Sequence, residues 1–214
     1  MNSWLDTALV LLILTNLYLL GSSRLNACIR TVAVQAALLG GILLLAQWNQ
    51  MGLRLALLTL VGTAIKAGLL PWLLRRAARE AGAQSEVEPI VGFTTSLLLG
   101  LGLLGLALHL AGRLPLPGVE GPSFLVPVAL FTMMVGLFLI VARKSAVMQA
   151  LAYLAMENGI YVFGMAYAVE EPLLVELGVL LDVFVAVFVM GIAIHHISRE
   201  FDHIDTDRLS ALKD

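Results

Sequence analysis

The sequence contains a single cysteine, Cys28, among its 214 residues. One thiol forms no internal disulfide and cannot supply the four thiolates of an iron–sulfur cluster. The sequence also lacks a glycine-rich phosphate loop, a His-Glu-x-x-His zinc motif and a Gly-x-Ser-x-Gly nucleophile elbow. We therefore expect neither a stand-alone hydrolase nor a nucleotide-driven pump, and we place any redox centre on another chain.

Charged residues are scarce as well. They make up 13% of the chain, the net charge is −2, and 60% of the residues are hydrophobic, with a mean hydropathy of +0.94. Soluble domains average about 25% charged residues. This composition indicates an integral membrane protein, and we expect no nucleic-acid partner. The N-terminus runs into apolar sequence without a basic segment or a cleavage site, which predicts a retained first helix.

Seven apolar stretches, separated by turn residues, are each long enough to cross a bilayer, which takes about 20 helical residues. The sequence therefore predicts an all-α, polytopic membrane helix bundle with seven transmembrane helices. Pro172 suits the first turn of the last helix, where no N–H donor is needed. The expected spans are Trp4 to Leu20, Ala27 to Ala46, Leu53 to Leu73, Ile90 to Leu110, Phe124 to Val141, Val147 to Val169 and Leu173 to Ile197.

The distribution of basic residues supports this number of spans. If the helices alternate in direction, ten basic residues fall on one side and only Arg54 and Arg113 on the other. Basic residues accumulate on the cytoplasmic side, so the N-terminus is expected outside and the C-terminus in the cytoplasm. The ten are Arg24, Arg30, Arg75, Arg76, Arg79, Arg143, Lys144, Arg199, Arg208 and Lys213.

Small residues recur every four positions in the fourth expected span, at Gly92, Ser96 and Gly100, with Gly102 and Gly105 beyond. Such a stripe lets a second helix approach closely, so we expect this face to be buried against protein. The alternative is that these glycines reflect only the general frequency of glycine in membrane helices.

Two acids stand near the middle of apolar spans: Glu157 in the sixth and Asp182 in the seventh. A carboxylate at the bilayer centre costs about 2.5–3.5 kcal/mol on insertion scales, and such residues commonly form proton relays. If the two helices are neighbours, the acids lie at similar depth. We interpret both as groups that load and release protons; the alternative is a static ion pair that fixes helix packing.

Lys66 places the opposite charge inside the third span. Thr59 and Thr63 precede it on the same helical face, and a polar stripe of this kind tends to face the interior of a bundle. Lys66 is therefore a candidate for tuning or relaying protons, or it snorkels toward the basic cluster that follows the span. Pro71 removes a backbone hydrogen bond and is expected to kink the helix.

Glu176 is a further candidate, as an access or relay group. It lies one turn after Pro172, where the helix dipole also stabilises an acid for structural reasons alone. His195 and His196 close the same helix, and only His109 lies within another expected span. We expect no haem and no metal in this chain.

Several segments resemble the hydrogenase-4 component E family. The most specific are Leu151 to Gly159 (LAYLAMENG) and the final helix, with Leu174 to Gly178 (LVELG) followed by Asp182 to Val187 (DVFVAV). Ile65 to Pro71 (IKAGLLP) and Leu209 to Lys213 (LSALK) are also similar to that family.

The resemblance implies a membrane subunit of complex I-related, group 4 nickel–iron hydrogenase assemblies of the formate hydrogenlyase type. It implies a four-helix membrane part at 1–113 and a three-helix part at 123–198, followed by a cytoplasmic tail at 199–214. The three-helix part is similar to the K-type subunit of complex I and to the C-type subunit of multisubunit cation/proton antiporters.

The resemblance also implies partners and cofactors. The partners are antiporter-like membrane proteins and a membrane protein like the H-type subunit of complex I, all within the lipid bilayer. Iron–sulfur clusters, and a nickel–iron centre where the assembly keeps one, are implied in partner subunits and not in this chain.

We therefore predict a subunit that is not an enzyme on its own. Glu157 and Asp182 carry protons along a path coupled to redox chemistry elsewhere, Lys66 tunes or relays, and Glu176 is an access group. Two alternatives stay open: a structural or assembly subunit without proton transfer, and an independent ion or small-solute carrier. The sequence contains no inverted repeat, which weakens the carrier interpretation.

Overall fold

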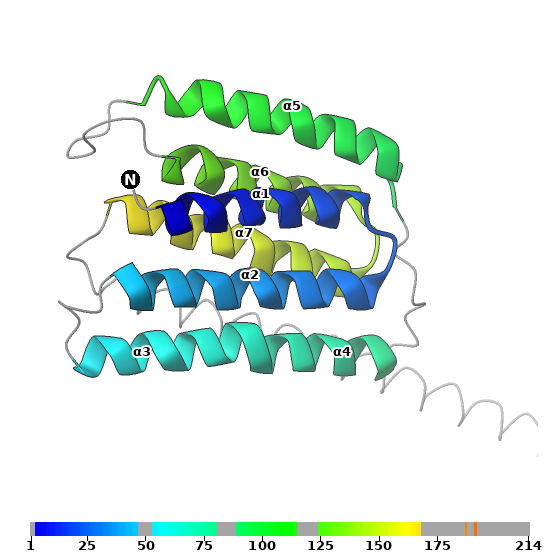
Figure 1. Ribbon diagram of the computed structural model, residues 1–214. Coiled ribbons are helices and arrows are strands. Elements are labelled where there is room, and N and C mark those ends of the chain that lie inside the picture. Colours follow the sequence, from blue (N-terminus) through cyan, green and yellow to red (C-terminus); the bar gives the residue numbers. More distant parts are fainter. Residues whose placement is uncertain are drawn as a thin grey trace, which may run out of the picture.

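The computed structural model describes residues 3–46, 53–80, 89–114 and 124–167, together with Val187 and Gly191. Apart from these two residues, the expected seventh span lies outside the described residues. So do Asp182, Glu176, Pro172, His195, His196 and the tail at 199–214. The described elements are α1 (Ser3–Gly21), α2 (Leu25–Ala46), α3 (Leu53–Ala64), η1 (Ile65–Leu69), α4 (Leu70–Glu80), α5 (Phe93–Ala111), α6 (Leu125–Ala142) and α7 (Ala146–Tyr167) (Figure 1).

Within these ranges the protein is a helical bundle, as the apolar stretches predicted. Four helices are long and apolar enough to cross a membrane: Trp4–Gly21, Leu25–Leu45, Phe93–Ala111 and Leu125–Ala142. Helix α7 has 22 residues, but Gln149, Glu157 and Asn158 lower its hydropathy. The third expected span is divided by the π-helical turn η1. The polytopic helical architecture is thus supported, whereas the number seven and the direction of the termini stay predictions.

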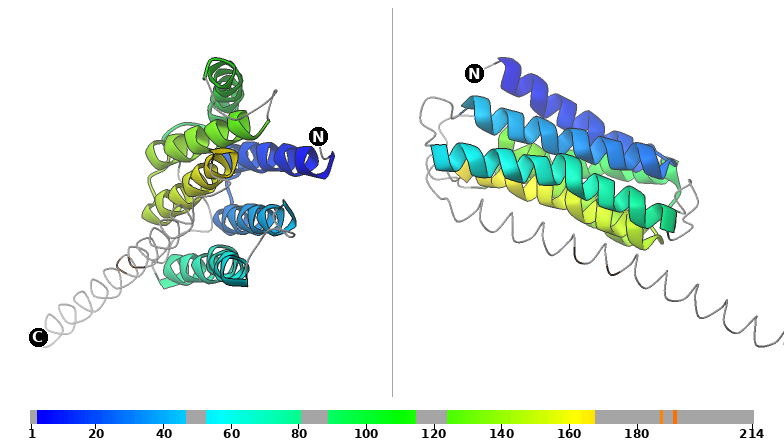
Figure 2. Two further views of the ribbon diagram at one scale, coloured as in Figure 1. Left: turned by 90° about the vertical axis from the view of Figure 1, so that its left-hand side faces the viewer. Right: turned by 90° about the horizontal axis from the view of Figure 1, so that it is seen from below.

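Successive helices run in opposite directions along the bundle, with α3, η1 and α4 taken together as one continuous helical segment. Helix α7 lies inside the bundle (Figures 1 and 2). It packs most extensively against α6 and also contacts α2 and α4, while α1 contacts α2, α5 and α6. Helices from the predicted N-terminal and C-terminal parts therefore share one bundle. The connection between α1 and α2 (21–25) and the connection between α6 and α7 (142–146) lie at the same end of this bundle (Figure 1).

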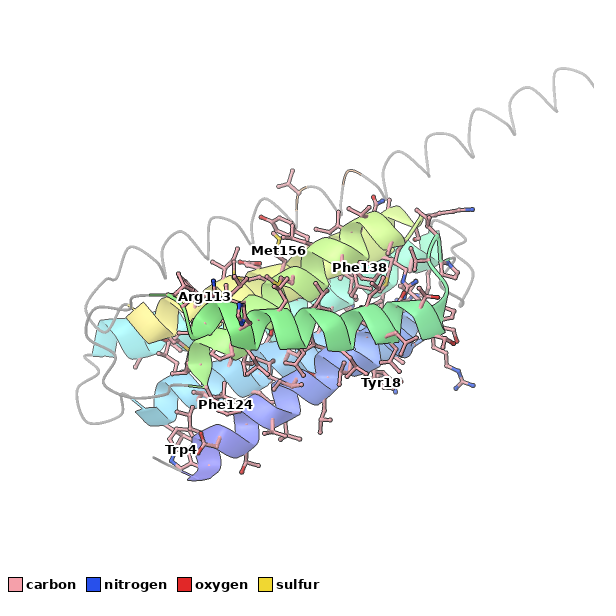
Figure 3. All side chains as sticks on the ribbon, turned by 90° about the horizontal axis from the view of Figure 1, so that it is seen from above. Trp4, Tyr18, Arg113, Phe124, Phe138 and Met156 are labelled. Carbon is pink, nitrogen blue, oxygen red and sulfur yellow. The ribbon has the colours of Figure 1, made fainter. Side chains whose placement is uncertain are left out.

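Aromatic and basic side chains mark the two ends. Trp4, Phe124 and Arg113 lie toward one end of the bundle, and Tyr18 lies toward the other (Figure 3). Their exposed fractions of 39%, 48% and 50% place the three aromatic rings on the outside of the bundle. Tyrosine and tryptophan favour the membrane–water interface. The outer surface between them is apolar, with Leu98 64% exposed on α5 and Val141 76% exposed on α6, which fits contact with lipid or with another subunit.

Two glycines allow α6 and α7 to approach closely. A Cβ atom at Gly136 of α6 would lie 2.6 Å from the backbone nitrogen of Met156, and one at Gly159 of α7 would lie 2.6 Å from the backbone nitrogen of Met133. Both distances are shorter than any van der Waals contact allows, so the crossing requires glycine on each helix. Gly159 ends the Met-Glu-Asn-Gly segment, so the close crossing with α6 lies two residues from Glu157.

The stripe predicted on the fourth span is buried in part. Ser96 and Gly100 of α5 are buried, and a Cβ atom at Gly100 would overlap the side chain of Leu20 on α1. Gly102 and Gly105 are exposed and have nothing within 4 Å of where a Cβ would stand. Close packing thus uses the first half of the helix, where α1 crosses it, and the later glycines have no such role among the described residues.

Arg143 ties three chain segments together at one end of the bundle. Its guanidinium donates to the carbonyl of Leu20 at the end of α1, at 2.9 Å, and to that of Val91 before α5, at 3.0 Å. It also lies over the ring of Phe93, with Cζ 4.9 Å from the centroid. Although the charge count treated Arg143 as a loop cation, the side chain is fully buried in protein. Burial lowers the pKa of Arg143 from its ordinary value, yet the guanidinium stays charged.

The α6–α7 crossing predicts a strong effect for Gly159→Ala. The new methyl group would meet the α6 backbone, and overpacking of this kind costs about 1–3 kcal/mol, so we expect a lower melting temperature for the full chain in detergent. Gly102→Ala is the matched control, because nothing lies near that position and alanine favours a helix. Equal melting temperatures for the two variants would contradict the close crossing.

Arg143→Gln should likewise destabilise the chain. The change removes two charge-assisted bonds to backbone carbonyls, each worth about 1.5–3 kcal/mol, and leaves both acceptors without that donor. Lys144→Gln removes the same charge from the adjacent, exposed position and serves as control. We expect thermal unfolding at clearly lower temperature for Arg143→Gln alone; a similar shift in both variants would show that only net charge matters.

Candidate functional site

The centre of the site is an ion pair between η1 and α7. Nζ of Lys66 donates to Oε1 of Glu157 at 2.8 Å, and their side chains are only 15% and 4% exposed. The structure thus brings together two of the four residues selected from the sequence. The ammonium group of Lys66 meets Glu157 within the bundle, so the sequence alternative in which it snorkels toward the basic cluster does not describe its position.

The π turn places Lys66. In η1 the backbone N–H of Leu70 donates to the carbonyl of Ile65, five residues back instead of four. Pro71 follows at once; its ring has no N–H and would clash with the carbonyl four residues earlier, that of Ala67, in a regular helix. The sequence predicted a kink at Pro71, and the structure has a widened turn just before it. Such turns occur frequently at functional sites.

Tyr161 completes the surroundings of the ammonium group. Nζ of Lys66 lies 5.6 Å from the centroid of its ring, within the range of a cation–π contact. Tyr161 follows Glu157 by four residues, so both project from the same face of α7. Sequence reasoning missed this residue, although that spacing from a mid-span acid was available as a signal.

The second carboxyl oxygen of Glu157 has no hydrogen-bond partner among the described residues. Oε2 of Glu157 and Oγ1 of Thr59 are buried and have no hydrogen-bond partner among the described residues. Thr59 comes from the polar stripe that the sequence placed on the face of Lys66, whereas Thr63 packs against Gly40 of α2. The carboxyl group thus has one oxygen engaged by Lys66 and a second that can take a proton without first breaking that bond.

A network of amide and hydroxyl side chains lies on the other side of α7. Asn158 donates to Gln35 of α2 at 3.4 Å, and Gln35 donates to Thr15 at 2.9 Å and to Asn16 at 3.1 Å, both on α1. Asn16 donates in turn to Thr132 of α6 at 2.8 Å. The sequence analysis did not select Gln35 or Asn16, but a polar side chain inside an apolar span carries the same signal as the acids do.

Three consecutive residues of α7 face three different neighbours. Glu157 contacts Lys66 of η1, Asn158 contacts Gln35 of α2, and Gly159 touches the backbone of α6. Successive helical residues are about 100° apart, so this triplet covers most of the helix circumference. The orientation of Glu157 is therefore fixed by contacts on all of these sides.

The remaining residues selected from the sequence do not contribute to the described part of the site. Asp182 and Glu176 lie outside the described residues, so their distance to Glu157 stays a prediction. His109 is exposed on α5. Among the described residues, no group of three or more histidine, cysteine, aspartate or glutamate side chains is arranged to hold a metal.

Comparison with known proteins identifies the family. The chain is 35% identical over 206 residues to an uncharacterised protein of Mycobacterium tuberculosis, covering 95% of this chain and 93% of that protein. It is 30% identical over 148 residues to hydrogenase-4 component E of Escherichia coli K12, covering 69% of this chain and 68% of that protein, and equally similar to hydrogenase-4 component E of Shigella flexneri. The chain belongs to the hydrogenase-4 component E family.

This similarity confirms the family that the sequence motifs predicted. No family model and no solved structure matches this member of the hydrogenase-4 component E family. The likeness of its C-terminal part to the K-type subunit of complex I therefore stays a prediction.

A double-variant cycle tests the ion pair in this hydrogenase-4 component E relative. Lys66→Met should lower the free energy of unfolding by about 3–5 kcal/mol, because it leaves a buried, unpaired carboxylate. Adding Glu157→Gln should restore much of that loss, since the charge without a partner is gone. Melting curves of the full chain in detergent measure both. Additive losses in the double variant would mean that the two residues do not interact.

Proposed function

We propose that this chain is an integral membrane subunit of a hydrogenase-type, complex I-related assembly, in which Glu157 takes up and releases protons opposite Lys66. The buried Lys66–Glu157 pair is the observation that carries the proposal. Family membership and the apolar helices support a membrane subunit of such a complex. On its own the chain is proposed to be non-catalytic.

The pair has the electrostatics that a proton-loading site needs. Two unit charges about 4 Å apart interact by about 4 kcal/mol at an effective dielectric constant near 20. A proton that binds Oε2 of Glu157 neutralises the carboxylate and leaves the charge of Lys66 without its counter-charge. That excess positive charge then favours release of a proton to the next group, so Lys66 tunes the site.

The next groups are proposed from the sequence. Asp182 lies at a similar expected depth in the predicted seventh helix, and Glu176 lies nearer its N-terminal end, as a relay and an access group. Redox chemistry in partner subunits would supply the energy, with iron–sulfur clusters and a nickel–iron centre held there. The proposed partners are antiporter-like membrane proteins and one like the H-type subunit of complex I, in the inner membrane of a bacterial or archaeal cell.

One observation favours a second candidate function. Lys66 contacts Glu157 directly, and a buried pair of this kind also occurs as a fixed element that specifies how helices pack. On that interpretation the chain is a structural or assembly subunit without proton transfer. The two candidates predict different results when Glu157 loses its charge.

Glu157→Gln in the assembled complex separates them. If Glu157 loads protons, the complex should run at wild-type size on a native gel and keep its redox turnover, while proton pumping into vesicles falls by about tenfold or more. The amide keeps the shape of the carboxyl but cannot titrate. Asp182→Asn is expected to behave in the same way.

Asp6→Asn is the matched control, since it makes the same chemical change at the start of α1, and it should leave pumping unchanged. Normal pumping by Glu157→Gln would exclude an essential proton-loading role. A complex that falls apart in this variant but not in Asp6→Asn would favour the structural candidate.

A further inference from the structure

The network beside Glu157 has a direction. Asn158 donates toward Gln35, and Gln35 uses both of its N–H groups to donate toward α1. The hydroxyl of Thr15 then donates to the carbonyl of Leu12, at 2.8 Å. Each of these donors therefore points away from α7, and this branch ends on a backbone oxygen.

The second branch ends in the same way. Asn16 donates to Thr132, and the hydroxyl of Thr132 donates to the carbonyl of Val128 at 2.8 Å. Thr132, Asn16 and Gln35 are all fully buried. Both branches thus stop at carbonyl groups that already belong to helices, inside the bundle.

A series of hydrogen-bonded amide and hydroxyl side chains such as this one does not conduct protons. Conduction requires each member to accept a proton on one side and give one up on the other, and then to reorient. A carboxamide N–H does not titrate in the physiological range, and the two threonine hydroxyls are committed to carbonyl oxygens. Reorienting Gln35, Asn16 or Thr132 would break a hydrogen bond of a fully buried side chain, which costs more than breaking an exposed one.

We infer that the Gln35 network, formed by Asn158, Gln35, Thr15, Asn16 and Thr132, closes the α1–α2 side of Glu157 to protons and holds α7 in the rotation that points Glu157 at Lys66. Gln35 is the positioning residue, because among the described residues it is the one that joins Asn158 to both Thr15 and Asn16 of α1. Protons then reach and leave Glu157 on the side of η1, where Lys66 holds one oxygen of the carboxyl group and the second oxygen lacks a partner among the described residues. The part concerning protons rests on the proposed function, whereas the positioning does not.

The test uses Gln35→Leu in the assembled complex with two readouts. The first is proton pumping into vesicles. The second is the infrared carbonyl band of protonated Glu157, assigned by its absence in Glu157→Gln, which reports the hydrogen bonding of that carboxyl group. We expect the band to shift and pumping to fall by about two- to tenfold, as for loss of one or two hydrogen bonds.

Four other results of these measurements would either overturn or support the inference. Loss of all pumping with an unchanged Glu157 band would mean that the network itself carries protons, and would overturn it. An unchanged band together with unchanged pumping would also overturn it. If the complex with Gln35→Leu does not assemble, Thr132→Val is used in its place, because it removes only the last hydroxyl of one branch. A shifted Glu157 band in Thr132→Val supports the positioning role of the network. An unshifted band refutes it.

The same measurements keep the two proposals apart. If Glu157→Gln pumps normally, the proton-loading function fails, while the band shift in Gln35→Leu still tests whether Gln35 positions Glu157. If Glu157→Gln abolishes pumping but Gln35→Leu leaves the band untouched, only the inference about the network fails.

Discussion

A carboxylate buried in the middle of an apolar helix needs a partner, and the rest of this structure depends on how Glu157 finds one. Lys66 supplies the opposite charge at 2.8 Å, within a bundle where leaving either charge alone would cost several kcal/mol. The cation reaches this position from a widened turn of its own helix, just before Pro71. The π-helical turn that carries Lys66 thus lies directly before a proline that a regular helix would not accommodate.

Helix α7 connects these features because its neighbouring side chains serve different helices. Glycine at position 159 brings α6 into backbone contact, asparagine at 158 joins the amide network, and glutamate at 157 meets the lysine. A larger residue at 159 would move α7 away from α6 and rotate or shift both polar contacts. The short segment combines packing and chemistry, so changes in it are expected to affect both.

The two ends and the outer face of the bundle serve other purposes. Arg143 engages carbonyl groups of Leu20 and Val91 and so closes one end without needing an acidic partner. The outward faces of α5 and α6 are lined with leucine and valine, so the favourable surroundings for this surface are acyl chains or apolar helices of other subunits. The Lys66–Glu157 pair and the amide network lie inside the bundle, away from this apolar surface.

The sequence by itself determined the helical architecture and the approximate positions of the helices within the described residues. It also singled out Glu157 and Lys66, because apolar length and a charge inside an apolar stretch are local properties of a chain. It also predicted the family, which the similarity to hydrogenase-4 component E confirms. The pairing of Lys66 with Glu157, the roles of Gln35 and Asn16, and the burial of Arg143 were decided only by the tertiary structure. These contacts join residues up to 123 positions apart, and helical periodicity gives the face of each side chain but not which helix lies opposite.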